Sequence, residues 1–124
     1  DYWQPMSDDE IQRLSQSKVA TIGCHGQYHN DLSCQPTEAA LEELQQNKSY
    51  LESLIQKEVV DLAYPHGNST DVLAQKAFEL GFTRQLAQGN YQESNLTFVK
   101  ERFGVNPYIS WENQLYYLMR ASYV

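Results

Sequence analysis

Two short apolar runs, each ending at a turn-forming sequence, flank one long amphipathic pattern in the first half of the chain. The first run, KVATIG at residues 18–23, ends at a glycine, and the second, VVDLA at residues 59–63, is followed by proline and glycine. Between them, apolar residues recur at spacings of three, four and seven residues, while Glu, Gln and Lys occupy the other positions. This pattern predicts a helix over residues 38–57 with Thr37 as its N-cap. A strand, a helix and a second strand in this order predict a parallel pair joined by a crossover helix.

The rest of the chain continues this alternation. Ser7 followed by Glu10 has capping-box spacing and predicts a helix over residues 7–16. Further elements are expected as a helix over residues 71–80 closed by Gly81, strands at 82–86 and 97–99, and an amphipathic helix that Ser110 opens. The order predicts an α/β fold with mostly parallel strands and crossover helices, in a single domain over residues 1–124.

Length and charge exclude several classes of protein. The 124 residues are too few for a complete eight-fold β/α barrel, which needs roughly 250. The chain has 9 Lys plus Arg against 16 Asp plus Glu, a formal charge of −7, so it offers no basic field for a phosphate backbone and we expect no nucleic-acid partner. No run approaches the roughly 20 apolar residues of a membrane span, and no transmembrane segment is expected.

Two histidines closely follow the first predicted strand. His25 and His29 are four residues apart, which is metal-ligand spacing, and two imidazoles favour zinc, cobalt or nickel over magnesium. A catalytic ion needs a third protein ligand, for which Asp31, Cys24 and His66 are the local candidates. The alternative is that the two histidines are unrelated surface residues. Cys24 and Cys34 are compatible with a disulfide, with metal binding or with free thiols.

The second predicted strand ends in the sequence LAYPHG, residues 62–67. Proline fixes one backbone angle and glycine tolerates unusual ones, so this turn can present the backbone amide of His66 to a ligand, as an oxyanion requires. An ordinary strand-ending turn is the alternative. The chain has no glycine-flanked nucleophilic serine and no phosphate-binding glycine loop, so metal-assisted hydrolysis is the sharpest enzymatic hypothesis.

These motifs, in this order, resemble a known family. The stretch SDDEIQRLSQSKVATIGCHGQYHNDLS and the later LESLIQKEVVDLAYPHG are similar to consecutive segments of the NodB-homology polysaccharide deacetylases, carbohydrate esterase family four. In that family a helix leads into a strand and a metal motif of two histidines, and the next strand ends in an alanine-tyrosine-proline-aromatic-glycine turn in one branch. The resemblance covers residues 6–104.

The resemblance implies a fold and an activity. The chain would be part of a distorted (β/α) barrel, and the enzyme would remove N- or O-acetyl groups from an N-acetylglucosamine-type polymer, using a divalent metal, most commonly zinc, and its bound water. His25 and His29 would hold the metal, the His66 amide would stabilise the oxyanion, and Arg102 would match a family arginine near the site, with a plain surface charge as its alternative. The turn residues assigned to substrate binding are Tyr64, Pro65 and Gly67.

The chain also departs from the family pattern. Nothing before Ser7 resembles the aspartate pair of the family, and no late histidine follows Arg102; Ala63 stands where another branch has an arginine, and His66 where an aromatic residue is usual. We therefore expect a partial NodB-like domain over residues 1–124 that is inactive alone, with activity in a longer, extracytoplasmic parent. The alternatives are a catalytically dead carbohydrate-binding relative and a small α/β interaction domain.

Overall fold

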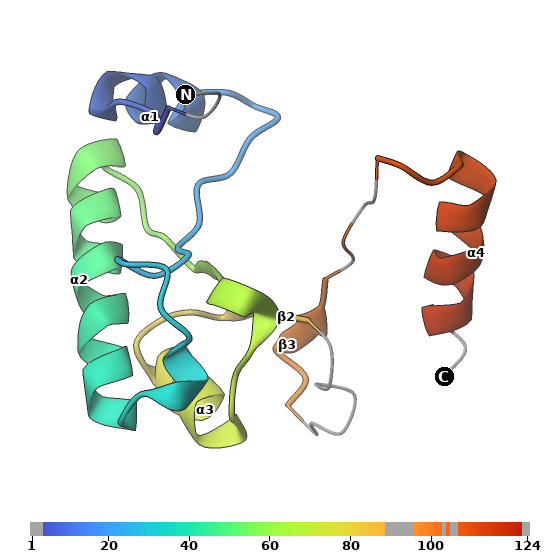
Figure 1. The fold of residues 1–124 in the computed structure, drawn as a ribbon. Coiled ribbons are helices and arrows are strands. Elements are labelled where there is room, and N and C mark those ends of the chain that lie inside the picture. Colours follow the sequence, from blue (N-terminus) through green and yellow to red (C-terminus); the bar gives the residue numbers. More distant parts are fainter. Residues whose placement is uncertain (1–3, 89–95, 103, 105–106, 123–124) are drawn as a thin grey trace.

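A computed structural model describes residues 4–88, 96–102, 104 and 107–122. Its elements are α1 (Asp8–Ser15), η1 (Leu32–Cys34), α2 (Thr37–Ile55), β1 (Asp61–Ala63), η2 (Pro65–Gly67), α3 (Asp71–Glu79), β2 (Arg84–Ala87), β3 (Val99–Glu101) and α4 (Trp111–Ser122). Figure 1 shows α2 and α3 on one side of the strands and α4 on the other side, standing apart from them. Within the described ranges, no helix combines the length and the hydrophobicity of a membrane-spanning segment.

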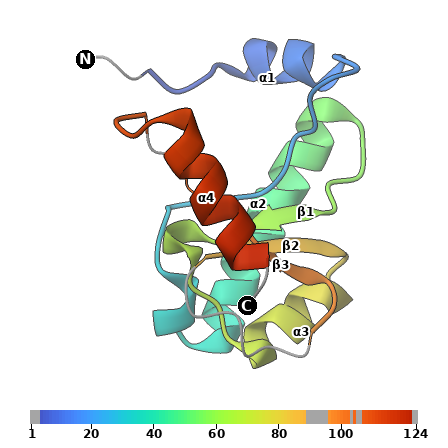
Figure 2. The same cartoon turned by 90° about the vertical axis from the view of Figure 1, so that its right-hand side faces the viewer.

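The strands form one parallel sheet in the order β1-β2-β3. Leu62 lies opposite Gln85, and Leu86 lies opposite Lys100. The helix α3 connects β1 to β2, so the predicted α/β fold with parallel strands and a crossover helix is confirmed. Figure 2 views the sheet from the side of α4, with α2 and α3 behind it.

The predicted first strand at residues 18–23 does not form. Only the residue after it pairs: Cys24 makes an isolated parallel bridge to Leu62, with its amide donating to the Asp61 carbonyl at 2.8 Å. Val19 is 96% exposed. A strand is stabilised by hydrogen-bonded neighbouring strands and by the burial of its side chains. Among the described residues, this segment finds such a neighbour only at its C-terminal end.

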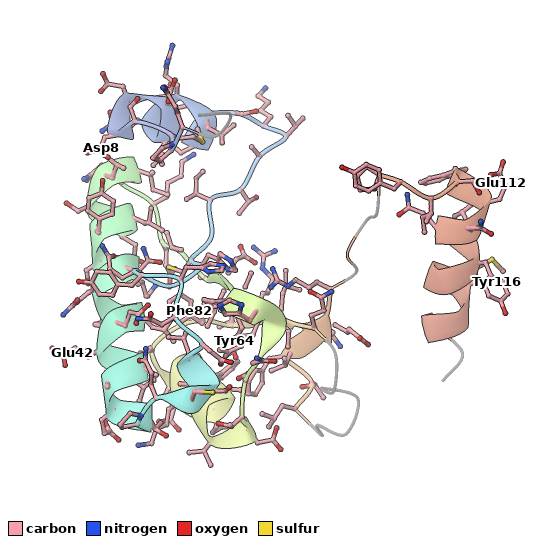
Figure 3. The ribbon with its side chains drawn as sticks, viewed as in Figure 1. Asp8, Glu42, Tyr64, Phe82, Glu112 and Tyr116 are labelled. Atoms are coloured by element: carbon pink, nitrogen blue, oxygen red, sulfur yellow. The ribbon has the colours of Figure 1, made fainter. Side chains whose placement is uncertain are left out.

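The two faces of the sheet have different environments. Along β2, Gln85 and Ala87 are buried while Arg84 and Leu86 are exposed. The Gln85 amide donates to the carbonyls of Ala74 and Phe82, which places it under α3. Figure 3 shows Tyr64 and Phe82 among the side chains between α2 and the strands. The core therefore lies on the helix-covered face, and the face carrying Arg84 and Leu86 is open.

The N-terminal cap of α1 is as predicted, whereas that of α2 differs from the prediction. The capping box of α1 is present, with the Glu10 amide donating to Ser7 Oγ at 3.3 Å and the Ser7 amide to Glu10 Oε2 at 2.8 Å. The predicted N-cap of α2 is wrong by one residue, because Pro36 holds that position and makes no side-chain cap bond. Cys24 and Cys34 are free thiols, the first buried and the second exposed.

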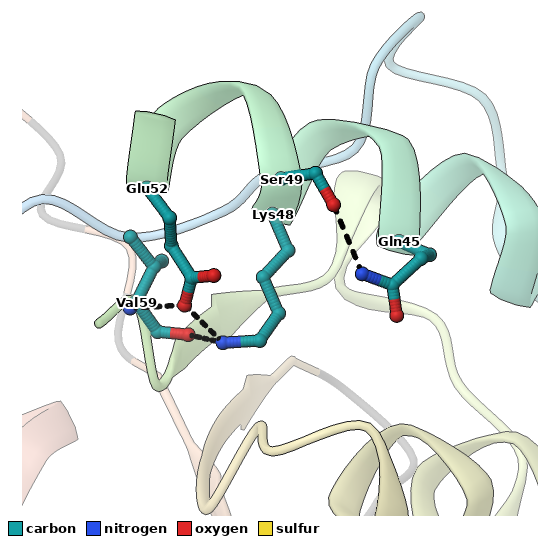
Figure 4. Close-up of polar contacts among 5 residues, drawn as sticks. All are labelled: Gln45, Lys48, Ser49, Glu52 and Val59. Carbon is teal, nitrogen blue, oxygen red and sulfur yellow. Dashed lines mark hydrogen bonds and ion pairs between the residues drawn. The ribbon is translucent and has the colours of Figure 1, made fainter. Parts of the chain in front are cut away.

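Two charged residues of α2 lie on its inward face, against the prediction that Glu and Lys occupy only the other face. Glu43 and Lys48 are each 7% exposed, beside buried Leu44 and Leu51. The Lys48 ammonium donates to Glu52 Oε1 and to the carbonyl of Val59, and the amide of that residue donates to the same carboxylate oxygen at 2.9 Å (Figure 4). This network joins the end of α2 to the start of the β1 segment.

Replacing Glu52 by glutamine is expected to lower the free energy of unfolding by about 1–3 kcal/mol at pH 7, because it leaves the buried Lys48 ammonium without a carboxylate. The hydrogen bond from Lys48, and then that from Val59, holds the pKa of Glu52 below its ordinary value. The folded carboxylate therefore stabilises the protein above the unfolded-state pKa of about 4.5, and this contribution is lost as pH falls through the lower folded pKa.

Urea unfolding of the wild type and of Glu52→Gln at pH 7 and at pH 3 checks this prediction. The difference between their free energies of unfolding is expected to be smaller at pH 3. The exposed Glu58→Gln variant is the control, and its free energy of unfolding is expected to stay close to that of the wild type. A difference that stays constant with pH would show that the Glu52 charge is not what stabilises the network.

Candidate functional site

The carboxyl ends of neighbouring strands meet at one edge of the sheet. The Gln88 amide, after β2, donates to the Gly67 carbonyl in η2 at 2.9 Å, and the Arg102 amide, after β3, donates to the carbonyl of Ala87 at 2.8 Å. The histidine loop begins after the bridge at Cys24, beside the end of β1. The parallel topology therefore brings both sequence motifs to the same edge, where ligands bind in folds of this class.

The ring of His25 is fixed by the neighbouring strand. Its Nδ1 lies 2.6 Å from the carbonyl oxygen of Ala63. A carbonyl only accepts hydrogen bonds, so Nδ1 carries a proton and donates, and in the neutral imidazole the lone pair is then on Nε2. A histidine that ligates a metal uses its second nitrogen in this way, which fixes both the tautomer and the orientation of the ring.

The three histidines of the chain lie side by side. The ring centroids of His25 and His29 are 4.9 Å apart, and those of His29 and His66 are 4.7 Å apart, both pairs in edge-to-face orientation with 61° between the planes. The predicted convergence of the two loop motifs is therefore present, with the His29 ring in the middle.

The backbone at two of these histidines is unusual. His29 has a φ of 56° and His66 a φ of 58°, in the left-handed region that side chains seldom adopt. Among the described residues other than glycine, only Gln56, at the C-terminal cap of α2, also has a positive φ. Strained backbone of this kind collects at functional sites because the surrounding structure must stabilise it.

His66 is the exposed residue of the LAYPHG turn, and no acceptor for its amide is found within the part of the chain that the structure describes. Tyr64, Pro65 and Gly67 of the same turn are buried. The Tyr64 hydroxyl donates to Gln85 Oε1 inside the core, and Pro65 and Gly67 are covered as well. These residues build the turn that exposes residue 66, and their assignment to substrate binding stays a prediction.

Arg102 lies against this turn. Its Nη2 donates to the Tyr64 carbonyl at 2.7 Å, while its Nε is buried without a hydrogen-bond partner among the described residues. Arg102 therefore contacts the backbone of the predicted site and is not a free surface charge. Its predicted role toward substrate stays a prediction.

The candidates for a third metal ligand are not equally suitable. Cys24 is buried, which raises the pKa of its thiol to about 12 and keeps it protonated. Both oxygens of Asp31 are used, one by the Ser33 hydroxyl at 2.6 Å and the other by the Asn68 amide at 2.7 Å, and these bonds lower the pKa of the carboxyl to about 2. Across residues 4–88 and the later described segments, no group of three or more His, Cys, Asp or Glu side chains is arranged to hold a metal ion.

Comparison with known proteins identifies the class. The polysaccharide deacetylase family matches residues 2–84, well over half of the chain. The chain belongs to the polysaccharide deacetylase family, as the order of its motifs predicted. No curated protein matches it.

Solved structures share the fold. The deacetylase PplD of Streptococcus pyogenes, solved with acetate, is 22% identical with a TM-score of 0.74, over 90% of this chain and 50% of its own. A de-N-acetylase of Aggregatibacter actinomycetemcomitans is 14% identical with a TM-score of 0.75, over 90% and 53%. A polysaccharide deacetylase of Bacillus cereus is 22% identical with a TM-score of 0.65, over 82% and 33%. The chain thus spans about half the length of the first two structures and has the α/β fold of this class.

Proposed function

We propose that this chain carries part of the active site of a metal-dependent deacetylase that acts on an N-acetylglucosamine-type polysaccharide. The observation that carries the proposal is the pair of histidine rings 4.9 Å apart, with Nδ1 of His25 fixed by the Ala63 carbonyl. Family membership supports an acetylated carbohydrate as substrate. An extracytoplasmic location is part of the proposal and follows from the family resemblance alone.

The donor set fits two of the three protein ligands that a catalytic zinc takes. His25 presents Nε2 as a lone pair, and His29 lies beside it. A divalent ion, when bound, supplies a Lewis acid that activates water and polarises an acyl carbonyl. No third ligand completes the set among the described residues, and we therefore assign activity to a longer parent.

The chain's own residues contribute position and hydrogen bonding. His25 and His29 would hold the cation at the end of β1. The backbone amide of His66 would donate to the oxygen of the acyl group as negative charge develops there. This role is supported by the turn, which leaves that amide without an acceptor in the described structure. Arg102 holds the same turn through the Tyr64 carbonyl.

Acetate release tests the proposal. The full-length encoded protein is expected to release acetate from acetylated chitooligosaccharides, to lose this activity in a chelator, and to regain it when Zn²⁺ is restored. Release that a chelator does not change would contradict the metal-dependent mechanism, and absence of release would contradict the enzymatic assignment.

A second candidate function has its own supporting observation. Because the described residues supply no third metal ligand, the chain also fits a carbohydrate-binding relative without catalysis. Calorimetry distinguishes the two functions: binding of chitooligosaccharides by the full-length protein, with no acetate released, favours the binding module.

A further inference from the structure

A buried carboxylate lies directly under the histidine loop. Glu43 is on the inward face of α2 and is 7% exposed. Among the described residues it has no ion pair with Lys or Arg, although the chain pairs Glu52, Glu38 and Asp61 in this way. A buried charge without a cation is costly unless hydrogen bonds satisfy its oxygens.

The hydrogen bonds to Glu43 all come from the histidine loop. Its Oε1 accepts from the backbone amides of Gln27 at 3.0 Å and Tyr28 at 3.2 Å, and its Oε2 accepts from the side-chain amide of Asn30 at 3.3 Å. These donors occupy the interval between His25 and His29 and the position just after it. The carboxylate thus binds the backbone of the segment that sets the separation of the two rings.

The loop is also shaped to fit this carboxylate. Gly26 has a φ of 78°, and a Cβ there would lie 3.0 Å from Glu43 Oε1 and 3.3 Å from Pro65 Cγ. The loop is therefore enclosed between α2 and the LAYPHG turn, and a larger residue at position 26 would push it off the carboxylate. The left-handed backbone of His29 lies between two of these donors, Tyr28 and Asn30.

We infer that Glu43 is a positioning residue: it binds the loop amides and so holds the His25 and His29 rings in the arrangement proposed to bind a metal. The inference rests on the proposed function for the identity of the ligand, while the structural role of the carboxylate stands on the hydrogen bonds alone. Removing a group that orients metal ligands typically lowers metal affinity by about 10- to 100-fold.

Three variants of the full chain separate positioning from general stability. Glu43→Ala removes the acceptor, Glu43→Gln keeps one oxygen that can accept from the two backbone amides, and Glu42→Ala changes the exposed neighbour on the same helix. Amide hydrogen exchange of residues 26–30 and Co²⁺ affinity, followed by visible absorption, are measured for each.

In Glu43→Ala we expect exchange at Gln27 and Tyr28 to accelerate at least about tenfold and Co²⁺ affinity to fall by about 10- to 100-fold, while the sheet and α2 keep their protection. Glu43→Gln is expected to restore most of both, and Glu42→Ala to match the wild type. Unchanged exchange at Gln27 and Tyr28 in Glu43→Ala overturns the inference. Equal acceleration across α2 and the sheet, without rescue by glutamine, overturns it as well.

The two readouts also separate this inference from the proposed function. Faster loop exchange in Glu43→Ala, together with no Co²⁺ binding by the wild type, supports the positioning role and contradicts the metal site. Normal Co²⁺ binding by the wild type and by Glu43→Ala, with unchanged loop exchange, would support the metal site and contradict the positioning role of Glu43.

Discussion

Replacing His25 or His29 by alanine is expected to lower the affinity for Zn²⁺ or Co²⁺ by at least about a hundredfold and to abolish acetate release by the full-length protein, because too few protein ligands then remain to hold a catalytic ion. Both histidines are exposed, so the free energy of unfolding is expected to change by less than about 1 kcal/mol. Isothermal titration calorimetry with Zn²⁺ and urea unfolding measure the two quantities.

His66→Ala is the matched control for these variants. Its ring contacts that of His29, but its proposed contribution is its backbone amide, which alanine retains. We therefore expect metal affinity within about tenfold of the wild type. Full metal affinity in His25→Ala, or a loss in His66→Ala as large as in His29→Ala, would contradict the assignment of the ligand pair.

Replacing Gly67 by alanine is expected to destabilise the protein by about 2–4 kcal/mol, since it combines two unfavourable effects. A Cβ at this position would lie 2.4 Å from Gln88 Cβ and 2.9 Å from the nitrogen of the same residue, and the backbone has a φ of 78°. Relieving the overlap must move the turn away from the end of β2, to which the Gly67 carbonyl is bonded. Urea unfolding measures the loss.

Gly104→Ala is the control for this substitution. Among the described residues, the nearest atom to a Cβ at position 104 is the amide nitrogen of the flexible Gln88 side chain, at 3.3 Å, so we expect a change below about 1 kcal/mol. Similar losses of stability in the two variants would show that the close approach of the turn to β2 is not what requires a glycine at position 67.

The chain's local patterns predicted most of the elements but not all of their surroundings. The capping box at Ser7 and the apolar spacing in α2 were sufficient for two helices, because both signals act within a few residues. The expected strand at residues 18–23 is absent because a strand depends on partners distant in sequence. Glu43 and Lys48 were assigned to the wrong face of α2, although Glu43 is next to the buried Leu44 and Lys48 is four residues after it. The sequence pattern does not reveal a buried charge, because its burial depends on partners that are distant in the sequence.

The same division applies to the candidate site. Spacing in the sequence was sufficient to select His25, His29 and the LAYPHG turn and to indicate that they approach one another, since parallel strands bring their carboxyl ends to one edge. Only the tertiary structure showed that the Ala63 carbonyl sets the tautomer of His25, that Tyr64 and Pro65 are buried, and that Glu43 binds the loop. Helix periodicity and turn conformation depend on residues that are neighbours in the sequence. Ring orientation and burial depend on contacts with residues that are distant in the sequence and become neighbours only in the folded chain.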